Sequence, residues 1–245
     1  LVREHADGGP VGYVRALAAV ARHDHPVESA ANLAAFCAND LVRHGPLSGP
    51  ELFDDGATVV ERAALDRVTA GDGPVAVFCN VMDAHSPLRA IRGYANTDVP
   101  EGWSSDGMTP TAVSTDPDAF ETDLHYYRTL YAAAVDYLDR WTVAFVERLR
   151  RSTDRETTVV VTADHGENLA YPADDRLFGH VGSLTEGLLH VPLVVLNAPE
   201  SPGLVEGTVS HLDLPHLVES LAAGVVPDLR RDRVVAEVVG RTPGN

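Results

Sequence analysis

The segment Thr157–Asn168, whose sequence is TTVVVTADHGEN, constrains the fold more than any other part of this 245-residue chain. Its first six residues are all threonine or valine, a β-branched run that is typical of a strand buried in a parallel sheet. Asp164 and His165 follow this run, and ligands in open α/β sheets bind beyond the carboxyl ends of the strands. Because aspartate and histidine can both bind a divalent metal, the segment predicts a metal site at the end of a strand.

Helical and strand-like segments alternate along the chain. Apolar residues recur at helical spacing in four segments, which are residues 10–45, 54–70, 126–151 and 212–223. Runs typical of strands occur at residues 75–82, 157–162, 191–197 and 233–239. This alternation predicts an α/β fold with a mostly parallel sheet flanked by helices. The length suffices for one large domain, so we expect residues 1–245 to form a single α/β domain with a largely helical lead-in over residues 1–70.

The charge of the chain is strongly acidic. Asp and Glu number 36, Lys and Arg together number 19, all of them arginine, and the net charge is -17. An acidic surface without lysine stays hydrated at high salt, so we expect a halophilic source. The same charge argues against nucleic acid and anionic membrane surfaces as partners. No apolar run is long enough for a membrane helix and the first residues do not match a signal peptide. Because the chain does not begin with Met, its location stays unknown, with a cytoplasmic location favoured.

Four short motifs follow or open the predicted strands. They are MDAHSP at residues 82–87, DHGE at 164–167, FGHVGSL at 178–184 and HVPLVV at 190–195. In this order and spacing, the motifs resemble the sulfatase family of the alkaline phosphatase superfamily, over about residues 70–240. The resemblance implies an alkaline-phosphatase-like α/β core over residues 71–245, which hydrolyses sulfate esters with the help of a divalent metal.

The resemblance also implies roles for particular residues. Asp164 and His165 match metal ligands of the family, and the ion would neutralise an oxygen of the ester. His85 matches a histidine near the ester oxygens and is a candidate to bind the anion or assist the leaving group, while Asp83 could orient its loop. His180 stands where many relatives carry a lysine that contacts the sulfate. All-oxygen sites of relatives imply Ca²⁺, and the histidine at position 165 leaves Mg²⁺, Mn²⁺ or Zn²⁺ open.

The same residues permit plainer structural roles. Asp164 could cap a helix, and His85 and His180 could serve only as hydrogen-bonding loop residues. Glu167 is expected to support the site from a second layer rather than to bind the metal. His190 opens a strand, where a structural role is the simpler interpretation.

The nucleophile of the family has no counterpart in this sequence. Family members carry a strand that ends in two metal-binding aspartates, followed by a C-x-P-x-R or S-x-P-x-R segment whose Cys or Ser becomes formylglycine in true sulfatases. Neither Cys37 nor Cys79 stands in such a segment, and both are expected to be buried free thiols. We therefore expect the chain to correspond to the C-terminal part of the enzyme, with formylglycine not encoded in it.

Three classes of function remain open on the sequence alone. The first is hydrolysis of a small-molecule or glycan sulfate ester. The second is the phosphoryl chemistry of the same superfamily, that of a phosphoesterase, a phosphonate hydrolase or a phosphoethanolamine-type transferase. The third is a noncatalytic remnant that binds anions or a partner. A Cys or Ser nucleophile in the C/S-x-P-x-R setting would favour the first class, and a bare Thr or Ser would favour the second.

Overall fold

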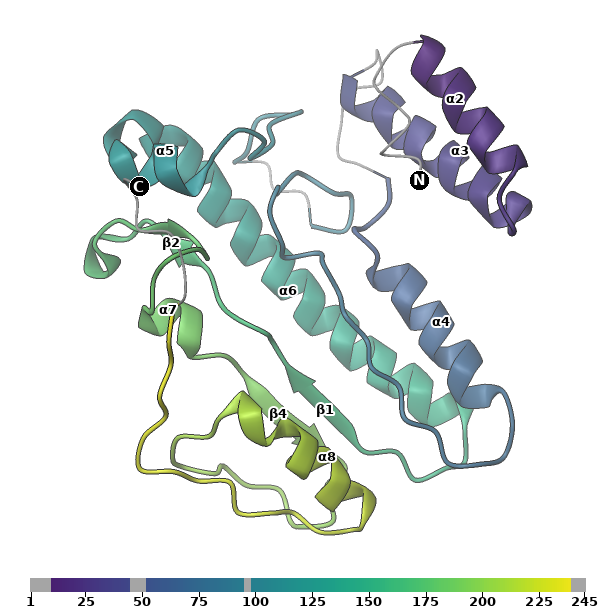
Figure 1. Ribbon diagram of the computed structural model, residues 1–245, viewed down its shortest axis with the longest axis vertical. Helices are drawn as coiled ribbons and strands as arrows, with labels where there is room; N and C mark the ends of the chain where they lie inside the picture. The colour runs from purple at the N-terminus through teal and green to yellow at the C-terminus, as the bar shows by residue number, and fades with distance from the viewer. Residues whose placement is uncertain (1–9, 45–51, 95–97, 239–245) are drawn as a thin grey trace. The chain divides into compact units, whose positions relative to one another are not determined.

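The computed structural model describes residues 10–44, 52–94 and 98–238 (Figure 1). The chain divides into two compact units, each built from two stretches of sequence. Unit 1 comprises residues 1–107 and 125–145, and unit 2 comprises residues 108–124 and 146–245. Among the described residues, no helix combines the length and the apolar character that crossing a membrane requires.

The first two helices in the described part of unit 1 pack against each other. They are α2 (Pro10–Ala21) and α3 (Pro26–His44). Their contact buries Val20 and Leu33, and Cys37 packs against this pair. Both helices lie within the segment 10–45, so the helical prediction there is confirmed.

A buried aspartate holds the start of helix α4 (Ala57–Thr69). Asp83 is fully buried, and its two carboxylate oxygens accept hydrogen bonds from the backbone N–H groups of Asp55 and Ala57, at 3.0 and 3.1 Å. The N–H groups at the start of a helix have no partner within the helix, so a carboxylate placed there stabilises it. Burial raises the pKa of Asp83 to about 6, an effect that the charge of Asp54 increases and that the two N–H groups oppose.

The long helix α6 (Glu121–Ser152) has 32 residues and is therefore about 48 Å long. It confirms the helix predicted over residues 126–151 and contributes residues to both units. Its middle part belongs to unit 1, where it lies beside α4 (Figure 1). There the hydroxyl of Tyr137 donates to the carboxylate of Asp54 at 2.8 Å, and burial together with this hydrogen bond raises the pKa of Tyr137.

Unit 2 contains shorter elements. Its helices are α5 (Pro110–Thr115), α7 (Glu186–Leu189) and α8 (Leu214–Ala222), with the 3-10 turns η1 (Pro117–Phe120), η2 (Pro172–Asp174) and η3 (His211–Asp213). Its strands are β1 (Val159–Thr162), β2 (Asn168–Leu169), β3 (Phe178–Gly179) and β4 (Leu193–Leu196). The helix predicted over residues 212–223 and the strands predicted at 157–162 and 191–197 are thereby confirmed.

The paired strands of the described residues are antiparallel. β1 pairs with β4, with Val160 opposite Val195, and β2 pairs with β3, with Asn168 opposite Gly179. The mostly parallel sheet that we predicted is therefore not confirmed, although helices and strands are both present. A continuous β-branched run favours a strand but does not report the direction of the neighbouring strand. The burial predicted for this run is wrong as well, because Val159–Val161 are half-buried and Thr162 is exposed.

Two predicted strands are not strands among the described residues. Residues 75–82 and 233–238 contain no strand, and residue 239 lies outside the described part. Phe78, in the first of these segments, is 93% exposed. Residues of high strand propensity form a strand only where another backbone segment supplies hydrogen-bond partners. Cys37 and Cys79 are free thiols, as predicted, but both are half-buried rather than buried.

Candidate metal and anion site

The residues that follow β1 form the candidate site. β1 ends at Thr162, whose hydroxyl donates to the backbone carbonyl of Pro192 at 2.8 Å, just before β4. Asp164 and His165 come two and three residues later. The pairing of β1 with β4 therefore fixes the start of the DHGE segment (residues 164–167) at the end of this small sheet.

Gly166 allows the DHGE segment to approach α7 closely. Its backbone N–H donates to the carbonyl oxygen of Leu188 at 2.9 Å. A Cβ atom on Gly166 would overlap the backbone carbonyl oxygen of Gly187. The absence of a side chain at this position is thus required by the space between two backbone segments.

His165, Glu167 and His180 come together beyond β1, and we call them the histidine–glutamate cluster. One ring nitrogen or carboxylate oxygen of each residue lies within 4.8 Å of the corresponding atoms of the other two. The rings of His165 and His180 stack, with centroids 4.5 Å apart and planes inclined by 29°. Oε2 of Glu167, whose side chain is only 8% exposed, lies 2.8 Å from Nδ1 of His180. The pairing of β2 with β3 brings His180 back beside the DHGE segment.

Each histidine of the cluster uses Nδ1 to contact an oxygen atom. Nδ1 of His165 lies 2.7 Å from the carbonyl oxygen of Gly166, and Nδ1 of His180 contacts the carboxylate of Glu167. Carbonyl and carboxylate oxygens accept hydrogen bonds, so Nδ1 carries the hydrogen in both rings. In the neutral rings, Nε2 then holds the lone pair with which an imidazole binds a metal or accepts a proton.

The comparison with protein families places this site in context. The sequence model of the family described as Sulfatase matches residues 40–225, which is more than half of the chain. The chain belongs to the sulfatase family. Membership implies an alkaline-phosphatase-like α/β fold and supports hydrolase chemistry in general. Comparisons with curated proteins and with solved structures gave no match.

The sulfatase family typically binds a divalent metal, and the residues of the cluster fit such an ion. Imidazole nitrogens and carboxylates are ligands of divalent metals in proteins. In the tautomer described above, the lone pair of each neutral ring is on Nε2, and the carboxylate of Glu167 adds negative charge beside His180. Glu167 was expected to support the site from a second layer; its carboxylate contacts His180, and the second-layer role stays a prediction.

Of the four residues that the sequence singled out for the site, three belong to unit 2 and one belongs to unit 1. His165 and His180 lie together in the cluster. Asp164 is next to His165 in sequence, but its side chain is 88% exposed and its Oδ1 accepts from the backbone N–H of His165 at 3.0 Å. His85 belongs to unit 1, is exposed, and places Nδ1 2.6 Å from the carbonyl oxygen of Ser86. The metal-ligand role of Asp164 and the catalytic role of His85 stay predictions.

Asn168 supports the site, and the sequence analysis did not single it out. Its side chain is 2% exposed, and Nδ2 donates to the carbonyl oxygen of Gly179 at 2.8 Å and to Oγ of Ser183 at 2.9 Å. Its Oδ1 accepts from the hydroxyl of Thr185 at 2.5 Å. Every polar group of the amide is therefore used to join the DHGE segment to the residues on either side of His180. The only sign of this role in the sequence is the position of Asn168 directly after DHGE, and an asparagine there is also typical of an ordinary loop.

We expect Asn168→Asp to destabilise the chain by about 2–3 kcal/mol, because a buried donor is replaced by an acceptor. The new carboxylate oxygen would face the carbonyl oxygen of Gly179 without a hydrogen between them. Urea unfolding at pH 7 measures the loss. Asn197→Asp is the matched control, since Nδ2 of Asn197 also donates to a backbone carbonyl, that of Thr157, but the residue is exposed. Equal losses in the two variants would contradict the role of Asn168.

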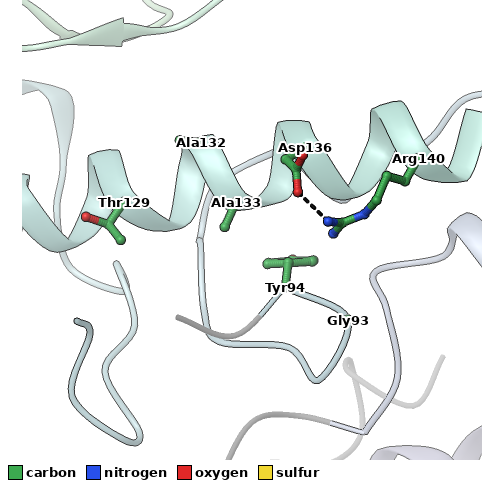
Figure 2. Close-up of a pocket in the computed structure, with 7 residues that line it drawn as sticks. All are labelled: Gly93, Tyr94, Thr129, Ala132, Ala133, Asp136 and Arg140. Carbon is green, nitrogen blue, oxygen red and sulfur yellow. Dashed lines mark ion pairs between the residues drawn. The ribbon is translucent and has the colours of Figure 1, made fainter. Parts of the chain in front are cut away.

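Unit 1 contains a groove along helix α6 (Figure 2). It lies between the Gly93–Tyr94 turn and α6, and it is lined by Gly93, Tyr94, Thr129, Ala132, Ala133, Asp136 and Arg140. Its charged groups are Asp136 and Arg140, which form an exposed ion pair at 2.6 Å. The lining contains no histidine and no cysteine, and none of its residues belongs to the four motifs that resemble the sulfatase family.

Proposed function

We propose that the chain supplies the metal- and anion-binding part of an enzyme that hydrolyses sulfate esters with the help of a divalent metal. The observation that carries this proposal is the histidine–glutamate cluster at the end of β1, which lies inside the region matched by the sulfatase family. The sulfatase family acts on sulfate esters, which supports this class of substrate. The net charge of -17 gives no support to nucleic acid as a partner.

Asp164 and His165 are the proposed metal ligands. A bound divalent ion would neutralise charge on an ester oxygen and hold the nucleophile. Nδ1–H of His165 donates to the carbonyl oxygen of Gly166, which fixes the orientation and the tautomer of the ring. Nε2 is therefore the ring nitrogen that can bind the metal. The exposed carboxylate of Asp164 lies beside it, with Oδ2 3.8 Å from Nε2 of His165. Ca²⁺, as in the all-oxygen sites of relatives, is the ion that this pair was expected to bind.

His180 and His85 are the proposed contacts of the ester. The carboxylate of Glu167 holds Nδ1–H of His180 and fixes its tautomer, so Nε2 is the atom that can meet an ester oxygen. When protonated there, the ring donates a hydrogen bond to the anion. His85 has the same arrangement, with Nδ1 against the carbonyl of Ser86, and its Nε2 could transfer a proton to the leaving group.

We expect the complete gene product to hydrolyse 4-nitrophenyl sulfate in the presence of a divalent metal and to lose this activity in EDTA. His85→Ala should lower kcat by about 10²–10⁴-fold, the usual contribution of a general acid. Release of 4-nitrophenol measures both effects. His190→Ala is the matched control, because His190 is an exposed histidine that pairs with Glu186 at 3.2 Å and has no proposed role.

Three outcomes would contradict parts of this proposal. Faster hydrolysis of 4-nitrophenyl phosphate than of the sulfate would indicate the phosphoryl chemistry of the same superfamily. Undiminished turnover by His85→Ala would remove the catalytic role of this histidine. The absence of hydrolysis of both esters, at every metal tested, would indicate a noncatalytic binding protein.

A further inference from the structure

The loop that carries His85 is held by contacts with the interior of unit 1 on both sides of this residue. Before it, the carboxylate of Asp83 binds the start of α4, and the backbone carbonyl of Asp83 accepts from the hydroxyl of Tyr94 at 3.3 Å. After it, the backbone N–H of Leu88 donates to Oγ of Ser105 at 2.7 Å, and both of these residues are buried. The backbone of the loop is therefore anchored, whereas His85 between the anchors is exposed.

Ser86 connects His85 to the long helix α6. Its backbone carbonyl oxygen lies 2.6 Å from Nδ1 of His85, and its Oγ lies 2.7 Å from the hydroxyl oxygen of Tyr127. Tyr127 belongs to α6 and is only 1% exposed, so the packing around its ring holds the hydroxyl in place. The contact with Tyr127 thus restrains the residue whose carbonyl group contacts the imidazole.

We propose that Tyr127 is a positioning residue, which acts through Ser86 to fix the orientation and the tautomer of the His85 ring. A carbonyl oxygen accepts hydrogen bonds, so Nδ1 of His85 carries the hydrogen while the carbonyl of Ser86 stays in place. When the serine is free to turn, the ring can rotate and the hydrogen can occupy either nitrogen. The effect on ester hydrolysis rests on the proposed function, in which His85 contacts the ester, but the positioning of the ring does not.

The contact between Ser86 and Tyr127 can be removed from either side without removing the packing of the tyrosine ring. Tyr127→Phe keeps the buried ring and deletes only the oxygen that contacts Ser86. Ser86→Ala deletes the other oxygen, and Ser86→Thr keeps a hydroxyl on the same carbon atom. Because two residues that act through one contact show effects that do not add, the single and double variants separate this role from a general loss of stability.

Nuclear magnetic resonance of the ring nitrogens of His85 tests the positioning directly. Long-range nitrogen–hydrogen correlation spectra at pH 8, where an ordinary imidazole is neutral, show which ring nitrogen carries the hydrogen. The signals of His85 are those that disappear in His85→Ala. We expect the Nδ1–H tautomer in the unsubstituted chain and a mixture of both tautomers in Tyr127→Phe and in Ser86→Ala. Ser86→Thr should retain the spectrum of the unsubstituted chain.

Turnover of 4-nitrophenyl sulfate by the complete gene product tests the consequence for hydrolysis. Tyr127→Phe should lower kcat at least about tenfold and leave KM unchanged, since a small misplacement of a reacting group can cost about 10²-fold in rate. Ser86→Ala should have the same effect, and the double variant should be no slower than either single variant. Tyr126→Phe is the matched control, because it loses a hydroxyl at the adjacent position of α6, where its ring packs against Trp103. It should keep both kcat and the tautomer of His85.

An unchanged tautomer of His85 in both Tyr127→Phe and Ser86→Ala would overturn the proposal. Thermal unfolding shows whether each variant folds, and either variant alone suffices if the other does not fold, because both remove the same contact. If the unsubstituted enzyme hydrolyses no ester, the proposed function fails, and the spectra of the ring nitrogens still decide whether Tyr127 positions His85.

Discussion

We expect Gly166→Ala to lower the free energy of unfolding by at least about 2 kcal/mol, because its methyl group cannot be accommodated without moving backbone. The added Cβ would overlap the carbonyl oxygen of Gly187, which belongs to α7 and has no flexible side chain to yield. The same movement would break the hydrogen bond from Gly166 to Leu188 and displace His165 from His180. Urea unfolding at pH 7 should show this loss of stability.

Gly187→Ala is the matched control for this prediction. A Cβ on Gly187 would come no closer than 3.7 Å to its neighbours, the nearest being the carbonyl oxygen of Glu167. The new alanine also favours the helical conformation of α7, so stability should be unchanged or slightly higher. A Gly166→Ala variant as stable as Gly187→Ala would show that the contact between the DHGE segment and α7 is looser than described.

Removal of the Asp83 carboxylate should have an effect of similar size in unit 1. Asp83→Ala leaves the N–H groups of Asp55 and Ala57 without their acceptor, and each buried group costs about 1–3 kcal/mol. We therefore expect a loss of about 2–4 kcal/mol in urea unfolding at pH 7. Asp66→Ala, in the exposed face of α4, should change stability by less than about 0.5 kcal/mol. Similar values for the two variants would contradict the anchoring role of Asp83.

The same aspartate should make the stability of the chain depend on pH. Its pKa in the folded chain is about 6, above the value of about 3.9 for an unfolded aspartate. The folded state therefore binds the proton more tightly, and this contribution to stability is complete below about pH 4 and is lost as the pH rises through 6. Asp83→Asn, which does not titrate, should lack the decrease between pH 4 and 6. A decrease of the same size in Asp83→Asn would assign it to other groups.

Local periodicity was sufficient to predict the main helices and the two central strands. The helices α4, α6 and α8 follow from apolar residues at helical spacing, and β1 and β4 follow from β-branched runs. The direction of pairing did not follow, because the run at residues 157–162 has the same composition with a parallel or an antiparallel neighbour. The strand predicted over residues 75–82 did not form, because a strand needs a neighbouring strand as its hydrogen-bond partner, and the residues of one segment do not show whether that partner is present.

The site was predicted in part for a similar reason. The sequence marked His165 and His180 separately, and their stacking depends on the pairing of β2 with β3, two strands too short to give a periodic signal. Asn168 escaped notice because its burial, rather than its residue type, makes its amide important. Asp83 was considered for the loop of His85, whereas its carboxylate holds α4, which lies 26 positions earlier in the chain at Ala57.

The interleaving of the two units along the chain has a consequence for synthesis on the ribosome. Unit 1 is completed only by residues 125–145, which follow the first stretch of unit 2, and unit 2 is completed only by the residues after Val146. All residues of unit 1 are therefore present only after residue 145 has been synthesised, and by then the first stretch of unit 2 has emerged without its second, in contrast to domains that emerge one after the other. A protease cut anywhere between residues 108 and 145 would remove part of both units from either product. Paired fragments from such a cut would have to reassociate before either unit could form.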